Sequence, residues 1–441
     1  MNFKTEFFLP TLLLLAGNGY AMDWFINPDI SASERYTDNL RLVTYAHKDD
    51  LISAVAPNLA FGYLADDNEL KAAVSLNQLL YHSESDLNYL EQVFSLNHLY
   101  KGEGWNTNVT AKYADQSSIS NQLDINGSGF IAALLPTFTR SVTPTFNYQL
   151  TEKNTLQLSY NYLDAAFSKP TSLQSNIFFA NYSNQSTSAT FTHYYSQRLS
   201  FNLTGSYTIY DAWNDVYSIT PPRFSLRTFR FLTTQQDQSY RQHSTTLSYQ
   251  IGLQYSLDER TTFTANAGIR DSSSKSSNIF NFTCFADGYC PPPTVLYDYP
   301  STTSGKIYSA SLSRQFEKGE ISLSANQQLN PASTGTQQQT SQLSASARYE
   351  IDERWSVGIS GQYLTAQSIS SLSANTGNLG SFNRNYTAVS PNLQWKWDQD
   401  MHLEFSYNHI DQHYTQTNLS ALSNSVQLQF FYQPQLNRQV K

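Results

Sequence analysis

Residues 389–408 are the stretch that most constrains the fold, because apolar side chains occupy every second position on both sides of a short acidic turn, Asp398-Gln399-Asp400. The apolar set is Leu393, Trp395 and Trp397 before the turn, and Met401, Leu403, Phe405 and Tyr407 after it. Period-two alternation puts the two sets on opposite faces of a strand, so the stretch predicts an antiparallel hairpin. Each arm has about ten residues, the length at which a tilted strand crosses a bilayer.

The same alternation recurs along the chain in about eighteen segments. They are 29–45, 51–64, 69–81, 89–100, 105–116, 137–150, 155–167, 184–195, 199–210, 243–257, 261–272, 304–316, 320–329, 339–351, 355–367, 384–397, 401–413 and 424–433. Short charged turns such as Asp258-Glu259-Arg260 alternate with longer polar loops, the longest near 211–240 and 273–303. Short turns at one end and long loops at the other are typical of outer-membrane barrels, with periplasmic turns and extracellular loops.

The composition is compatible with such a barrel. Of the 441 residues, 14% are charged and 14% aromatic, which excludes a disordered chain. Mean hydropathy is −0.45, and after the first 20 residues no apolar run reaches the length of a membrane helix. Alternating strands cancel in such an average, so the value does not argue against a barrel. The formal charge of −8 and the lack of a basic run give no electrostatic case for nucleic acid.

The first residues predict a secretory signal. Lys4 precedes an apolar stretch, 7–17, that is too short to span a membrane, and Gly19-Tyr20-Ala21 offers small residues for cleavage. We therefore expect residues 1–21 to be a signal peptide and residues 22–441 to be one outer-membrane barrel domain.

Two cysteines, Cys284 and Cys290, lie close together between turn-forming residues. In an exported chain this spacing predicts one local disulfide rather than a metal site, with free thiols as the alternative. The disulfide would staple the loop at 273–303.

The sequence also predicts two features near the short turns. Polar-face positions there carry a cluster of charges that a closed barrel would gather at the periplasmic mouth as an ion-pair network, or as separately solvated charges: Arg348, Glu350, Lys396, His402 and Glu404. Four tryptophans lie within a few residues of short turns, where a periplasmic aromatic girdle would lie: Trp105, Trp355, Trp395 and Trp397.

Three strands share a Val-x-Pro-x-apolar pattern, with Pro57, Pro144 and Pro391 on the apolar face. Proline donates no ladder hydrogen bond, so we expect a bend in the barrel wall at each.

The chain shows no catalytic signature. Its eight histidines are scattered, and no nucleophile elbow or zinc-protease motif occurs. We expect no enzyme activity, no metal and no cofactor, although an outer-membrane hydrolase built from residues on adjacent strands stays open as the least favoured alternative.

Residues 24–42, WFINPDISASERYTDNLRL, resemble the opening of the PEP-CTERM system-associated outer-membrane β-barrel proteins, a family related to barrel porins. The recurring Val-x-Pro-x-Leu strands and Asp-Glu-Arg turns are similar too. The resemblance implies a Gram-negative outer membrane and an association with exopolysaccharide production, and it carries over no catalytic residue. Unlike many outer-membrane barrels, the chain does not end on an aromatic residue, because Gln433 to Lys441 follow Tyr432.

The sequence thus predicts an all-β fold: a transmembrane antiparallel β-barrel of about eighteen strands that acts as a porin-like channel or scaffold, associated with exopolysaccharide export. A general diffusion porin for small hydrophilic solutes is the alternative. The expected partners are outer-membrane lipid, the barrel assembly machinery, and a polysaccharide or small hydrophilic solute in the lumen.

Overall fold

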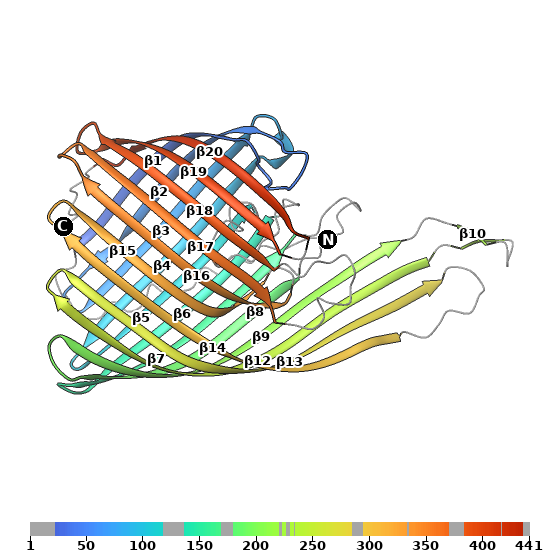
Figure 1. Ribbon diagram of the computed structural model, residues 1–441, viewed down its shortest axis with the longest axis horizontal. Helices are drawn as coiled ribbons and strands as arrows, with labels where there is room; N and C mark the ends of the chain where they lie inside the picture. The colour runs from blue at the N-terminus through green and yellow to red at the C-terminus, as the bar shows by residue number, and fades with distance from the viewer. Residues whose placement is uncertain are drawn as a thin grey trace.

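The computed structural model describes residues 23–117, 136–168, 180–219, 223–225, 230–232, 234–284, 294–332, 335–369, 383–415 and 417–434, with backbone alone at 216–238 and 278–299. Eighteen strands form one sheet (Figure 1). They are β1 (Asp23–Thr37), β2 (Asp50–Leu64), β3 (Asn68–Tyr81), β4 (Tyr89–Gly102), β5 (Trp105–Ser117), β6 (Pro136–Thr151), β7 (Asn154–Phe167), β8 (Asn181–Tyr194), β9 (Leu199–Ile219), β12 (Thr234–Asp258), β13 (Thr261–Cys284), β14 (Thr294–Phe316), β15 (Gly319–Pro331), β16 (Gln337–Glu350), β17 (Trp355–Ser368), β18 (Arg384–Lys396), β19 (Met401–Tyr414) and β20 (Leu419–Tyr432). A two-stranded sheet, β10 (Arg223–Ser225) with β11 (Arg230–Leu232), and a 3₁₀ turn, η1 (Ser85–Leu87), complete the described elements.

The sheet closes on itself through β1. Ile30 of β1 pairs with Pro57 of β2 on one side and with Tyr432 of β20 on the other, and all the strand pairs of the barrel are antiparallel. Closure leaves no unpaired sheet edge around the wall, which is the condition for a β-structure to cross a bilayer. The predicted all-β barrel of eighteen strands is confirmed.

The hairpin that anchors the sequence interpretation forms as predicted. Leu393 pairs with Phe405 and Trp395 with Leu403 across β18 and β19. In the turn, the Asp398 carboxylate accepts hydrogen bonds from the backbone N–H groups of Asp400 and Met401 at 2.9 and 2.8 Å. An acidic side chain therefore fixes the reversal, as Asx turns do.

The two faces of the wall differ in chemistry. Large apolar side chains are exposed on the outer face, among them Leu203, Ile251 and Ile269 with 56, 68 and 61% of their surface accessible. Hydroxyl groups on neighbouring strands pair on the inner face, as Ser206 does with Ser248 at 2.6 Å. An apolar band outside a closed wall and polar groups inside require lipid around the barrel, which is the pattern of outer-membrane barrels. Among the residues that the structure describes, no helix is long and apolar enough to cross a membrane.

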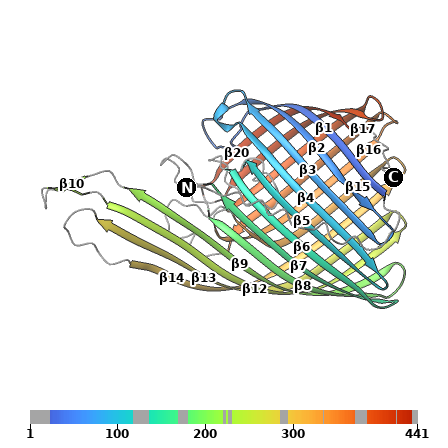
Figure 2. The same ribbon diagram turned by 180° about the vertical axis from the view of Figure 1, so that it is seen from behind.

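Short turns gather at one end of the barrel and longer connections at the other (Figures 1 and 2).

Two predictions about the strands were wrong. The first strand is Asp23–Thr37 rather than 29–45, because at Asp38 the chain leaves the wall: the Asp38 carboxylate accepts hydrogen bonds from the backbone and side-chain nitrogens of Asn424, both at 2.7 Å.

The second error concerns the predicted loops at 211–240 and 273–303. Much of both regions is strand, because β9, β12, β13 and β14 have 21, 25, 24 and 23 residues and extend beyond the other strands (Figure 1). Toward the extended part of these strands the outer face becomes polar, as at Asp211 on β9 and His243 on β12, whose side chains meet at 2.6 Å. Ladder hydrogen bonds need no apolar face outside the bilayer, so hydrophobic alternation underestimates the length of such strands.

Each proline of the repeated pattern interrupts one ladder. Pro57, Pro144 and Pro391 pair in register with the preceding strand. Toward the following strand, the registered pairs skip these positions, as between Val389 and Asn392 in β18. The missing N–H therefore faces the following strand.

Candidate functional site

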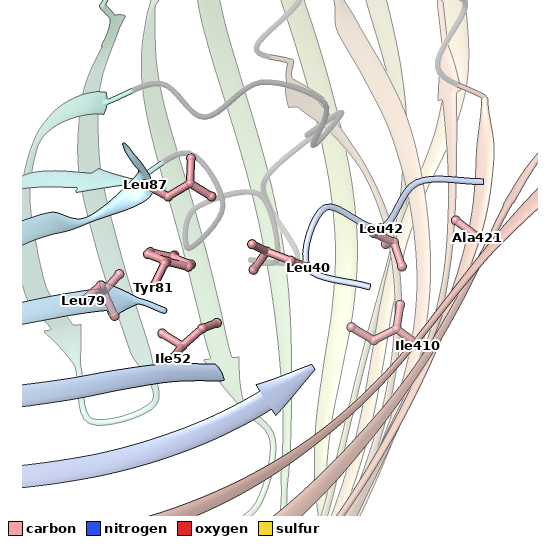
Figure 3. Close-up of a cluster of buried hydrophobic side chains, with 8 residues drawn as sticks. All are labelled: Leu40, Leu42, Ile52, Leu79, Tyr81, Leu87, Ile410 and Ala421. Atoms are coloured by element: carbon pink, nitrogen blue, oxygen red, sulfur yellow. The ribbon is translucent and has the colours of Figure 1, made fainter. Parts of the chain in front are cut away.

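The lumen is the candidate site, and two connections at the long-loop end fold onto its inner wall. The first is the segment 38–49 between β1 and β2. Leu40 and Leu42 of this segment lie among buried side chains of the strands on both sides of β1 (Figure 3). That cluster, called here the apolar contact, consists of Leu40, Leu42, Ile52, Leu79, Tyr81, Leu87, Ile410 and Ala421. Because β2 and β3 supply one side and β19 and β20 the other, the segment bridges neighbouring parts of the inner wall.

Polar groups shape the same segment. The Asn39 side chain donates to the carbonyl oxygens of Val43 at 2.9 Å and Leu422 at 2.8 Å, and its oxygen accepts from the backbone N–H of Val43 at 3.1 Å. Leu42 has a φ of 46°, a left-handed conformation that side chains other than glycine adopt at a cost. The hydrogen bonds of Asn39 and the burial of Leu42 together offset that cost.

An ion pair ties the segment to the next connection. The Glu84 carboxylate binds the Arg41 guanidinium and, at 2.7 Å, the Lys48 ammonium. Burial acts to raise the pKa of Glu84, but the hydrogen bonds from Lys48 and Arg41 outweigh it and hold that pKa below its usual range. The ionised carboxylate thus favours the folded position of segment 38–49.

The second connection joins β15 to β16. Its hydrogen bonds to Tyr210 of β9 and to Tyr240 and Ser244 of β12 are called here the polar contact. Its backbone carbonyl at Gly335 accepts a hydrogen bond from the Tyr240 hydroxyl at 3.0 Å, and that at Thr336 accepts one from the Tyr210 hydroxyl at 3.4 Å. Ser244 donates to the Gln337 side chain at 2.8 Å. Gly335 has a φ of +77°, and a Cβ there would lie 2.7 Å from the Tyr240 ring. Glycine is therefore required for this approach.

A cavity of about 350 Å³ lies in the lumen wall between β20 and β5. Arg35, on the inner face of β1, and Glu91, on β4, are its charged lining residues. Glu91 is 5% exposed, and its carboxylate accepts hydrogen bonds from the Asn77 side chain at 2.9 Å and from the Ser117 backbone N–H at 3.1 Å. The cavity thus places opposite charges on two sides of a small space.

The five charged residues predicted to gather near the short turns lie on the inner face of neighbouring strands. Lys396 pairs in register with His402 across β18 and β19, and Glu350 ends β16. The Arg348 guanidinium donates to the Gln394 side chain at 2.9 Å, and Glu404 accepts from Asn392 at 3.4 Å. A cavity of about 210 Å³ separates Arg348 from Glu404. Among these five described residues, amide side chains rather than direct ion pairs join the charges.

The four predicted girdle tryptophans lie at the short-turn end. The rings of Trp355 and Trp395 stack at 5.8 Å, and those of Trp395 and Trp397 at 5.7 Å. Trp105 packs between Tyr100 and Phe146. Sequence reasoning missed one further member: Trp24 of β1 is 48% exposed and packs on Tyr63 at 5.3 Å. Its place near a strand end was hidden because the first strand was predicted to begin at residue 29. That these rings form an interfacial girdle remains a prediction.

Other predictions stay untested. Cys284 ends β13, but Cys290 lies outside the described residues, so the disulfide remains a prediction. Residues 1–21, the predicted signal peptide, also lie outside them. Within the described part of the chain, no group of three or more His, Cys, Asp or Glu side chains is placed to hold a metal ion.

Sequence reasoning also missed the charges at the apolar contact and in the 350 Å³ cavity. Arg35 alternates with Ser31 and Ser33 on β1, a signal that the sequence did carry. Glu84 and Arg41 left no such signal, because both belong to connections rather than strands.

Comparison with known proteins gives one family match. Residues 292–423 match the family model described as "Putative MetA-pathway of phenol degradation". Curated protein sequences give no match.

Solved structures that resemble this chain are outer-membrane barrels. The ferric-catecholate import receptor Fiu from E. coli K12 has 9% identity and a TM-score of 0.45, with 93% of this chain and 82% of that chain covered. The outer membrane channel DcaP of Acinetobacter baumannii has 11% identity and a TM-score of 0.43, with 95 and 100% covered. The CymD monoaromatic hydrocarbon channel has 10% identity and a TM-score of 0.32, with 93 and 90% covered.

Proposed function

We propose that this barrel is a passive outer-membrane channel for small solutes. The observation that carries the proposal is the polar, cavity-bearing inner face of a closed eighteen-stranded wall. Barrels of 16 to 18 strands are wide enough to leave an aqueous lumen. The apolar and polar contacts at the long-loop end narrow that lumen without requiring chemistry from any side chain.

Small organic molecules are the solutes that this channel would pass. The segment 38–49 folded onto the inner wall favours small solutes over polymers, because it occupies space that a wide pore would leave to water. The phenol-degradation family match over 292–423 supports organic compounds as cargo. An association with exopolysaccharide production rests only on the resemblance of residues 24–42 and stays the second candidate, which polysaccharide synthesis genes beside this one would favour.

Conductance in planar bilayers tests the proposal. The barrel is extracted in detergent, and heat-modifiable migration on a gel first establishes that it is closed. We expect stepwise conductance from the folded protein and none from a heat-denatured sample at the same detergent concentration. Folded, heat-modifiable protein that inserts into the bilayer and passes no current would overturn the channel function and leave a scaffold.

A further inference from the structure

The 350 Å³ cavity has an apolar side and a polar side. Its apolar side is formed by Ile52, Ala54 and Ala56 of β2, with Val93 of β4. Serines and glutamines from β1 and β20 lie on the other side, where Arg35 projects. A site with a greasy wall and a few polar groups suits a small organic molecule with one polar end.

Within the described part of the chain, Arg35 is the cavity-lining charge that has no polar partner. It points inward from β1, in register with Ile52 of β2 and Gln427 of β20, and it is half-buried. Its guanidinium makes no hydrogen bond or ion pair with any residue that the structure describes. A guanidinium carries five donors in a fixed fork, and leaving it unpaired away from bulk water is costly.

Buried polar groups in native proteins are nearly always satisfied. A half-buried arginine that lines a cavity and has no acceptor among the described residues therefore points to an acceptor that is bound only at times.

Glu91 limits the charge of that acceptor. Its carboxylate faces the same cavity but is already compensated by Asn77 and the Ser117 N–H. The negative charge of Glu91 disfavours a dianion in the same cavity, because like charges a few ångströms apart repel strongly in a confined site. A monoanion placed on the Arg35 side gains the guanidinium and avoids Glu91.

We propose that this cavity binds small organic monocarboxylates during passage through the lumen. The carboxylate pairs with the Arg35 fork, which matches its two oxygens. The hydrocarbon part lies on Ile52, Ala54 and Val93. The inference rests on the proposed channel function, because it names the class of solute that the lumen selects.

Binding of benzoate to the purified, heat-modifiable barrel in detergent tests the site. Saturation-transfer NMR titration is expected to show benzoate binding at least ten times more tightly than benzyl alcohol, its uncharged analogue. Arg35→Gln should remove that preference, and Arg35→Lys should retain part of it, because lysine keeps the charge and loses the fork.

The matched control is Arg348→Gln, which removes an inward-facing arginine at the short-turn end and should leave benzoate binding unchanged. Equal affinity for benzoate in the wild type and Arg35→Gln would overturn the proposal. Tighter binding of phenylalanine than of benzoate would overturn it as well, since it would make Glu91 an ammonium site.

Conductance separates this inference from the channel function. Benzoate binding that depends on Arg35 in a barrel without conductance would uphold the cavity and reject the channel. Conductance with unaltered benzoate affinity in Arg35→Gln would uphold the channel and reject the cavity. When both hold, Arg35→Gln should also lower the preference of the open pore for benzoate over sodium by several-fold.

Discussion

The two connections that fold onto the inner wall are held there by different kinds of contact. The apolar contact buries Leu40 and Leu42 in a cluster of eight side chains, whereas the polar contact relies on hydroxyl and amide groups such as Tyr240 and Ser244. Burial of an apolar side chain gives about 1.5–3 kcal/mol, while a hydrogen bond that exchanges with water gives about 1 kcal/mol. In a water-containing lumen, the first contact should therefore be the firm one and the second the one that opens.

The largest effect is expected from Leu42→Ala in the apolar contact. Truncation of a buried leucine costs about 2–5 kcal/mol, enough to release segment 38–49 from the wall. Trypsin should then cleave at Arg41 or Lys48, and single-channel conductance should rise. The control is Leu59→Ala on the lipid-facing side of β2, where the same truncation should leave both readouts unchanged. Resistance of Leu42→Ala to trypsin would show that burial does not hold the segment.

Gly335→Ala should disrupt the polar contact. The new Cβ would lie 2.7 Å from the Cβ of Ala180 and from the Tyr240 ring, in a left-handed conformation whose strain is about 1–3 kcal/mol. We expect a larger or noisier conductance with an unchanged thermal transition of the barrel. Gly205→Ala is the control, because its Cβ would meet nothing nearer than 3.9 Å. Identical conductance in the two variants would contradict the tight packing.

Acidification tests the ion pair beside the apolar contact. Because the pKa of Glu84 is lowered in the folded protein, its contribution is complete above the unfolded pKa of about 4.3 and is lost as the pH falls through the folded value. Segment 38–49 should thus become several-fold more protease-sensitive as the pH falls below about 4.3, assayed with pepsin. Glu84→Gln should show that sensitivity already at neutral pH and respond less to acid. A pH response that is equal in both proteins would assign it to other groups.

The smallest effect is expected from Tyr240→Phe. The variant loses the hydroxyl, which lies 3.0 Å from the Gly335 carbonyl oxygen and 2.5 Å from the Gln242 side-chain oxygen, at a cost of about 1 kcal/mol for the hydrogen bond that it donates. In single-channel recordings, the fraction of time that the channel spends at its higher conductance, with the polar contact open, should rise a few-fold. Tyr210→Phe, which loses a longer bond of 3.4 Å, should change it less. A ranking in the opposite order would mean that ring packing, not hydrogen bonding, controls the contact.

The short turns and the membrane-crossing parts of the strands could be predicted because both depend on neighbours in sequence. Asp398 fixes its own turn through adjacent N–H groups, and alternation on β18 and β19 sorts side chains to lipid or lumen. The position of Arg348 and Glu404 on the inner face followed from the same rule. Their link through Gln394 and Asn392 did not, because the rule gives a face and not a partner.

Residues 36–39, Tyr-Thr-Asp-Asn, belong to the stretch that resembles the PEP-CTERM system-associated barrels, and their structure could not be predicted from the sequence. They were read as part of a strand, yet Asp38 binds Asn424 and Asn39 binds the Leu422 carbonyl, each more than 380 positions away along the chain. Those partners exist only once β20 has closed against β1. The turn into the lumen is thus a consequence of closure.

The sequence by itself determined the alternating strands, the turns and the two chemistries of the wall, since each arises from side chains one or two residues apart. Only the tertiary structure decided what occupies the interior: which connections fold inward, that Arg35 faces Glu91 across a cavity, and that four strands continue past the bilayer. The physical reason is that closing the wall brings distant residues together at distances that no local periodicity encodes.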